Sequence, residues 1–211
     1  MVSDAFAMRR SPSQSRSRAT VVRILDAAAA TIEERGYDET TTTAVAARAG
    51  VSVGSLYQYF PSKAALLVAL ADVHVGEATQ RWHDLIAGWT CEDSPERVMR
   101  RAVEAAVELH GPDTRLHREM FHRTVRTDAL DTRLRALHEI VDRTARNMLV
   151  DVGVAPEAVG LGARSLVTTV SVVLHDVVLA DDLDATHDER IAVVVDACLG
   201  LVEGSIRTRR C

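Results

Sequence analysis

The segment from residue 41 to residue 63 constrains the fold more than any other part of the chain. It predicts two short helices joined by a tight turn, in which Gly50 stands where the first helix should end with a positive φ angle. Thr41 and Ser52 are suited to cap the two helices, because a hydroxyl oxygen accepts from an otherwise unpaired backbone N–H. Pro61 ends the second helix, since its ring disfavours the helical conformation for the residue before it.

The second of these helices is too polar to lie inside a core. Leu56 and Phe60 are four residues apart and share one face, which must point inward. The other positions carry Val53, Gly54, Ser55, Tyr57, Gln58 and Tyr59. A helix with small and hydrogen-bonding residues on its exposed face is shaped to enter a groove, and the major groove of duplex DNA admits a helix. The competing interpretation is plain packing, because helix-turn-helix geometry also occurs in all-α proteins that bind no DNA.

The charges of the chain are unevenly spread. Residues 1–63 carry eight Arg or Lys against six Asp or Glu, a net charge of +2, and the remainder carries 17 against 24, a net charge of −7. An acidic body behind a mildly basic head keeps nonspecific DNA affinity low while it orients the head toward phosphates. Lys63 lies in the first turn of the next helix, which Ser62 caps, and the helix dipole disfavours a cation there. We therefore expect a nearby anion, for which a phosphate group is suitable.

The rest of the 211-residue chain also predicts helices, since alanine, valine and leucine dominate its apolar positions. The last two helices, at about residues 156–181 and 187–207, are apolar over more than one face. The second apolar face of such a helix pair must also be covered, and the partner subunit of a homodimer can cover it. The alternative is a deeply buried core within a monomer.

Residues 23–70 resemble the DNA-binding domain of the tetracycline-repressor (TetR) family of bacterial regulators. The resemblance covers about a quarter of the chain and rests on specific motifs. These are Ile24-Leu25-Asp26-Ala27-Ala28, Gly36-Tyr37, Thr40-Thr41, Ala-Gly-Val-Ser at 49–52, Gly-Ser-Leu-Tyr-Gln-Tyr-Phe at 54–60, Lys63 and Leu66-Leu67.

The resemblance implies an all-α protein in which an N-terminal three-helix helix-turn-helix domain precedes a larger helical domain, with about nine helices. We expect a disordered basic arm at residues 1–17, the DNA-binding domain at 18–63 and an effector-binding and dimerisation domain at 64–211. The implied function is a ligand-responsive repressor that binds a palindromic double-stranded operator as a homodimer through its two C-terminal helices. Activation is the alternative to repression.

In this family the second helix of the motif enters the major groove. By this resemblance, the residues expected to contact bases are Val53, Gly54, Ser55 and Gln58. The residues expected to contact phosphates are Thr41, Ser52, Tyr57, Tyr59 and Lys63. Gln58 is the best direct reader, because its amide can bond an adenine bidentately. Many family members carry a lysine where Val53 stands, so this chain lacks the expected guanine contact there.

A pocket for a small apolar or aromatic effector is expected in the larger domain. Its candidates are the bulky, adaptable side chains of Trp82, Trp89, Met99, Met120, Phe121 and Met148, with His175 as a polar contact. Taken singly, each of these residues fits ordinary core packing, and His175 fits a core or interface position equally well.

No set of nucleophile, base and acid is recognisable, so we expect no enzyme and no cofactor. His138-Glu139 followed by Asp142 imitates a zinc-protease motif but lacks the second histidine, so no metal site is expected. Three cysteines without framework spacing, no long apolar run and no signal-peptide pattern favour a cytoplasmic protein that does not enter a membrane. Two other classes remain open, namely a ligand-carrying dimer whose head has lost DNA affinity and an α-helical enzyme that uses a cavity of the body.

Overall fold

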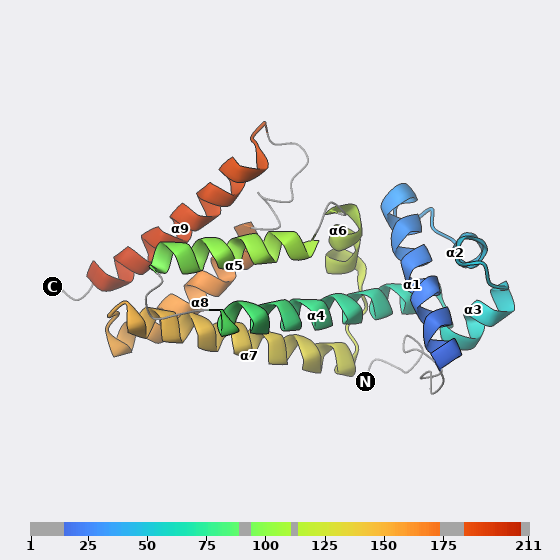
Figure 1. Cartoon of the computed structure of the whole chain (residues 1–211), viewed down its shortest axis with the longest axis horizontal. Helices are drawn as coiled ribbons and strands as arrows, with labels where there is room; N and C mark the ends of the chain where they lie inside the picture. The colour runs from blue at the N-terminus through green and yellow to red at the C-terminus, as the bar shows by residue number, and fades with distance from the viewer. Residues whose placement is uncertain (1–14, 89–93, 111–113, 174–183, 208–211) are drawn as a thin grey trace. The chain divides into compact units, whose positions relative to one another are not determined.

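The computed structural model describes residues 15–88, 94–110, 114–173 and 184–207. Within these ranges the chain forms nine α-helices and no strand, which confirms the predicted all-α class (Figure 1). The helices are α1 Ser15–Arg35, α2 Thr42–Ala49, α3 Val53–Tyr59, α4 Lys63–Ala87, α5 Pro95–His110, α6 Thr114–Arg123, α7 Asp128–Asp151, α8 Pro156–Val173 and α9 His187–Arg207. Over the same ranges we find no helix with the length and hydropathy that a membrane crossing needs.

The chain divides into two compact units. Unit one is formed by Met1–Gly76 and Pro112–Leu134, and unit two by Glu77–Gly111 and Arg135–Cys211, each considered over its described residues. Unit one therefore extends beyond residue 63, where the sequence places the end of the DNA-binding domain. The physical reason is that the first half of α4 is part of the same core, since Leu66, Leu67 and Leu70 are buried in the cluster that holds α1, α2 and α3 together.

Helix α1 begins at Ser15, so the last residues of the arm expected at 1–17 are helical. Arginine is a good helix former, and the serines of this stretch are tolerated in a first turn. Residues 1–14 lie outside the described residues.

The core of unit one is built on α1. Ile24, Ile32, Leu56 and Phe60 are fully buried there, and α6 adds half-buried Leu116 and Met120 at its edge. Two buried threonines satisfy their hydroxyls on backbone carbonyls one turn away. Thr31 Oγ1 donates to Ala27 O at 2.6 Å, and Thr40 Oγ1 donates to Gly36 O at 2.8 Å.

The core of unit two is formed mainly by α5, α7, α8 and α9. Leu149, Val194, Val195 and Cys198 are fully buried in it. Burial raises the pKa of the Cys198 thiol to about 11, which leaves it protonated and unreactive at neutral pH. Several large apolar side chains of this unit are nevertheless exposed, namely Val150, Leu161, Val172 and Val193.

Gly50 is expected to be intolerant of alanine for backbone reasons alone. Its φ angle is +65°, and a Cβ built there meets nothing within 4 Å, so a side chain has room but the left-handed conformation penalises it. Gly50→Ala should lower the free energy of unfolding of unit one by about 1–2 kcal/mol, and Gly50→Asn by less, because asparagine tolerates this conformation better. Urea unfolding of the two variants tests this, and equal losses for alanine and asparagine would contradict it.

Candidate nucleic-acid interface

The turn between α2 and α3 has the capping geometry that the sequence predicts. Thr41 Oγ1 accepts from Ala44 N at 3.2 Å and Ser52 Oγ accepts from Ser55 N at 3.1 Å, so each hydroxyl satisfies one free N–H at the start of its helix. Gly50 adopts the left-handed conformation at the end of α2, where its N–H returns to carbonyls of the last turn. These three contacts fix the path of the backbone from α2 into α3.

Helix α3 separates a buried face from an exposed one. Leu56 and Phe60 have no exposed surface, whereas Val53, Gly54, Tyr57 and Gln58 are exposed side by side on the opposite face. The outward face is thus presented by a short helix that is anchored at two buried positions. Ser55, also predicted to contact bases, is half-buried, and its hydroxyl lies 2.8 Å from the Ser52 hydroxyl.

The predicted phosphate contacts occupy different surroundings. Thr41 and Ser52 are exposed and act as helix caps. The Tyr57 hydroxyl lies 3.1 Å from the Thr42 hydroxyl, which links α3 to the start of α2 across the turn. Tyr59 is half-buried and packs against the core of unit one. Thr42 was not among the predicted residues, because nothing in its sequence position distinguishes it from its threonine neighbours.

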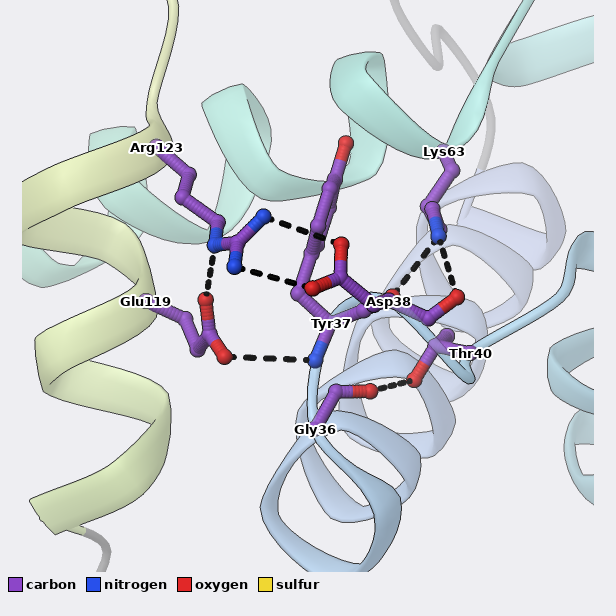
Figure 2. Close-up of polar contacts among 7 residues, drawn as sticks. All are labelled: Gly36, Tyr37, Asp38, Thr40, Lys63, Glu119 and Arg123. Atoms are coloured by element: carbon purple, nitrogen blue, oxygen red, sulfur yellow. Dashed lines mark hydrogen bonds and ion pairs between the residues drawn. The ribbon is translucent and has the colours of Figure 1, made fainter.

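Lys63 makes contacts that the sequence does not reveal. Its Nζ donates to Tyr37 O at 2.7 Å and to Asp38 O at 3.2 Å, and it lies 4.3 Å from the centroid of the Tyr37 ring. The cation that the dipole of α4 disfavours is therefore compensated within the protein, by carbonyls of the loop that joins α1 to α2. Figure 2 shows the amine directed at these two oxygens.

The other side of Tyr37 is covered from α6 (Figure 2). Arg123 donates to both carboxylate oxygens of Asp38 at 2.9 Å and forms an ion pair with Glu119 at 2.6 Å, while Glu119 accepts from Tyr37 N at 3.5 Å. The Arg123 guanidinium lies 5.7 Å from the Tyr37 ring centroid. Burial raises the pKa of the Tyr37 phenol, against a smaller opposing effect of the Arg123 charge, so the phenol stays neutral at physiological pH.

Helix α6 also contacts the end of α1 directly. Glu33 Oε2 accepts from Leu116 N at 2.6 Å and so satisfies an N–H in the first turn of α6, while Arg115 reaches the carbonyls of Glu33 and Glu34 at 3.4 and 3.3 Å. A carboxylate near a helix start and a guanidinium near a helix end both suit the helix dipoles. Such contacts pair residues more than 80 positions apart, so sequence spacing does not indicate them.

Helix α2 is joined to α1 by an exposed ion pair. Arg48 Nη1 lies 2.6 Å from Glu34 Oε2. The hydrogen bond from Arg48, followed by the charges of Arg35 and Arg48, lowers the pKa of the Glu34 carboxyl. The carboxylate therefore stays ionised at any pH relevant to DNA binding. Because both side chains are about half exposed, the pair contributes little stability and serves mainly to order this edge of the helix-turn-helix.

The residues predicted to line an effector pocket fall into different parts of the structure. Met99 and Met148 are buried in the core of unit two, and Met120 packs against the core of unit one. Trp82 belongs to unit two, where its indole N–H donates to Thr144 Oγ1 at 3.3 Å. Trp89 and His175 lie outside the described residues, and so does the side chain of Phe121.

In the described part of the chain, no group of three or more His, Cys, Asp or Glu side chains is arranged to hold a metal ion.

Comparison with known proteins identifies relatives of this interface. The sequence model described as bacterial regulatory proteins of the tetR family matches residues 24–70. The HTH-type transcriptional repressor KstR of Mycolicibacterium smegmatis is 55% identical over 47 residues, which cover 22% of this chain and 23% of KstR. The chain thus matches less than a quarter of this curated relative. The fatty acid metabolism regulator protein of Bacillus subtilis is 33% identical over 67 residues, which cover 32% of this chain and 34% of that protein.

Solved structures extend the likeness of the fold to most of the chain. The fatty acid degradation regulator FadR from Bacillus halodurans superposes with a TM-score of 0.64 at 18% identity, covering 90% of this chain and 97% of FadR. AibR, solved in complex with isovaleryl coenzyme A and operator DNA, superposes with a TM-score of 0.61 at 17% identity, covering 84% of this chain and 97% of AibR. At these sequence identities the superpositions show a likeness of fold alone.

Proposed function

We propose that this chain is a ligand-responsive transcriptional repressor of the tetR family of bacterial regulatory proteins, whose sequence model matches residues 24–70. The observation that carries the proposal is the outward face of α3. Val53, Gly54, Tyr57 and Gln58 are exposed together on a helix that is anchored from behind by Leu56 and Phe60 and capped at Ser52. Such a helix can enter a major groove while its buried anchors stay packed in the core.

The proposed division of roles follows the chemistry of this face. Gln58 reads a base edge through its amide, Val53 contacts a thymine methyl, and Gly54 and Ser55 allow close approach of the backbone. Thr41, Ser52, Tyr57 and Tyr59 supply hydroxyls to phosphate oxygens, which set the position of the helix on the duplex. Among these proposed phosphate contacts, the one from Tyr57 has the most support. Its exposed hydroxyl lies beside that of Thr42, so two hydroxyls can face one phosphate.

We propose that the chain forms a homodimer through exposed apolar residues of unit two. Leu161 is 73% exposed and Val172 52% exposed on α8, and Val193 is 56% exposed on α9, which is costly for a monomer in water. Pairing through α8 and α9 would cover them, and a palindromic operator offers a two-fold symmetric dimer two half-sites in successive major grooves, about 34–36 Å apart. Sedimentation equilibrium tests the oligomeric state, and a monomer at micromolar concentration would count against this proposal.

The proposed effector is a small apolar or aromatic molecule bound in the helical body. Met99 and Met148 give unit two an adaptable core, and Trp82 presents an indole whose N–H is already satisfied. AibR was solved with isovaleryl coenzyme A, whose isovaleryl group is small and apolar, so compounds that carry a short branched acyl group are the first to try. A compound that binds the protein and lowers its affinity for the operator would support the proposal. If every compound that binds leaves operator affinity unchanged, the proposed ligand response is wrong.

A salt titration of binding to the DNA that flanks the gene tests the function itself. We expect binding whose logarithm falls linearly with the logarithm of salt concentration, with a steep slope that reflects several phosphate contacts. A folded protein that binds neither this DNA nor any member of a random-sequence pool would contradict the proposal. In that case the chain would be better explained as a ligand carrier.

A further inference from the structure

We propose that Asp38 is an internal competitor for the phosphate expected at Lys63, and that Arg123 of α6 holds the Asp38 carboxylate out of this competition. The inference rests on the proposed function, because it assigns a role within DNA binding. It begins from the Lys63 amine, which donates to Tyr37 O at 2.7 Å and to Asp38 O at 3.2 Å. An ammonium has three N–H donors, so these two bonds leave one N–H that can bond a phosphate.

The Asp38 carboxylate is well placed to take the same N–H. The backbone carbonyl of Asp38 already bonds the Lys63 amine, so rotation of the side chain between staggered positions can bring the carboxylate toward the amine without moving the backbone. The Asp38 side chain is exposed, so packing restrains this rotation little. A carboxylate paired with Lys63 would offer the amine a charged oxygen, as a phosphate does, and operator DNA would have to displace it.

In the structure Arg123 holds this carboxylate instead (Figure 2). Its Nη1 and Nη2 each donate to one carboxylate oxygen of Asp38 at 2.9 Å, which is the paired geometry that makes bonds between arginine and a carboxylate specific. The Nε of the same guanidinium lies 2.6 Å from Glu119 Oε2, and Glu119 Oε1 accepts from Tyr37 N at 3.5 Å. Glu119 therefore fixes the guanidinium beside the loop, with both of its Nη groups directed at Asp38.

The charge of Asp38 matters for DNA binding because of its place in the chain. Asp38 lies three residues before Thr41, which is proposed to contact a phosphate, and charges interact over about 8 Å at physiological ionic strength. Pairing with Arg123 offsets the negative charge of Asp38 and also keeps the carboxylate away from the Lys63 amine. The side chains of Arg123 and Asp38 are 43% and 72% exposed, so water screens their ion pair and we expect an effect of only several-fold.

The first test is a rescue experiment on operator binding, with a salt titration of each variant. Arg123→Gln releases the carboxylate and should weaken binding roughly fivefold per subunit, equivalent to about 1 kcal/mol, whereas Asp38→Asn should bind at least as tightly as the wild type. The double variant Arg123→Gln/Asp38→Asn should regain the affinity and the salt slope of the wild type. The matched control is Arg123→Gln/Glu39→Gln, which has the same net charge but loses the exposed carboxylate of the next residue, and it should stay weak.

Three results of this experiment would overturn the inference while the proposed function stands. If Arg123 itself contacts a phosphate, the Asp38 double variant stays weak and its salt slope falls by about 0.9. If the ion pair acts only by ordering the loop, Asp38→Asn weakens binding as much as Arg123→Gln does. If net charge alone matters, the Glu39 double variant is rescued as fully as the Asp38 double variant.

A second measurement needs no DNA and therefore separates the inference from the proposed function. Lys63 is the only lysine in the sequence, so labelling lysine with ¹⁵N at its amine gives one side-chain NMR signal. This signal should move in Arg123→Gln, where the carboxylate reaches the amine, and return when Asp38→Asn is added. An unchanged signal in a folded Arg123→Gln protein overturns the inference. Failure of the wild type to bind any DNA overturns the proposed function, whatever the lysine signal does.

Discussion

Replacement of Phe60 by alanine should unfold the DNA-binding half of this protein more readily than any exposed substitution on α3, the helix that Phe60 directly follows. Phe60 has no exposed surface and is the largest fully buried side chain in the described residues. Its removal leaves a cavity in the core of unit one, and truncation of a buried phenylalanine costs about 3–5 kcal/mol. That is a large part of the stability of a small compact unit, so we expect operator binding to be lost at temperatures where the wild type binds.

Tyrosine and tryptophan signals separate the two units in this experiment. All three tyrosines, Tyr37, Tyr57 and Tyr59, lie in unit one, whereas Trp82 lies in unit two. Thermal unfolding followed by tyrosine absorbance should therefore shift strongly to lower temperature in Phe60→Ala. Tyr57→Ala removes an aromatic side chain that is 41% exposed on α3 and should shift it far less. Similar shifts for the two variants would show that Phe60 does not anchor the helix.

The helix-turn-helix was predictable because its determinants are local. A capping hydroxyl, a glycine with positive φ and a proline each act on their own neighbours, so Thr41, Gly50, Ser52 and Pro61 define the motif before any tertiary contact is known. The buried face of α3 follows from the four-residue spacing of Leu56 and Phe60 in the same way. The extent of unit one did not follow from the sequence. Gly76 stands at the boundary between the units, but α4 runs through it without interruption, so the glycine does not mark the end of a helix.

The cluster around Tyr37 was not predictable from spacing. Gly36 and Tyr37 are recognisable as a helix end, and Glu119 and Arg123 as a pair four residues apart on a helix, yet the sequence does not say that the two features meet. Lys63 illustrates the same difficulty. A cation in the first turn of a helix needs compensation, and here carbonyl oxygens of the protein accept from the amine, which the residue's position alone does not indicate. The effector-pocket prediction rests on bulky, adaptable side chains and one polar histidine, and such residues occur in a packed core as well as in a pocket.

Replacement of Gln58 by alanine should relax the sequence preference of the protein without altering its general attraction to DNA. Gln58 is exposed on α3 and carries no charge, so its loss changes base reading and leaves the phosphate contacts intact. A bidentate contact from glutamine to adenine discriminates against other bases by about 1–3 kcal/mol, which corresponds to a loss of preference between roughly fivefold and 150-fold at one base pair of each half-site. The salt slope should remain that of the wild type, since no counterion is released at this position.

Selection from a random DNA pool tests whether Gln58 reads a base. It is carried out in parallel on the wild type, Gln58→Ala and Gln80→Ala. Gln80 is an exposed glutamine on α4 in unit two, where it bonds Asp84, so its replacement controls for the change of residue type. We expect one position in each half-site to require adenine in the wild type and in Gln80→Ala and to accept any base in Gln58→Ala. A consensus that is identical for all three proteins would assign base reading to Val53, Gly54 and Ser55 alone. Because those residues offer only apolar contact and one hydroxyl that is paired with Ser52, such a result would imply that the operator is recognised largely by its shape.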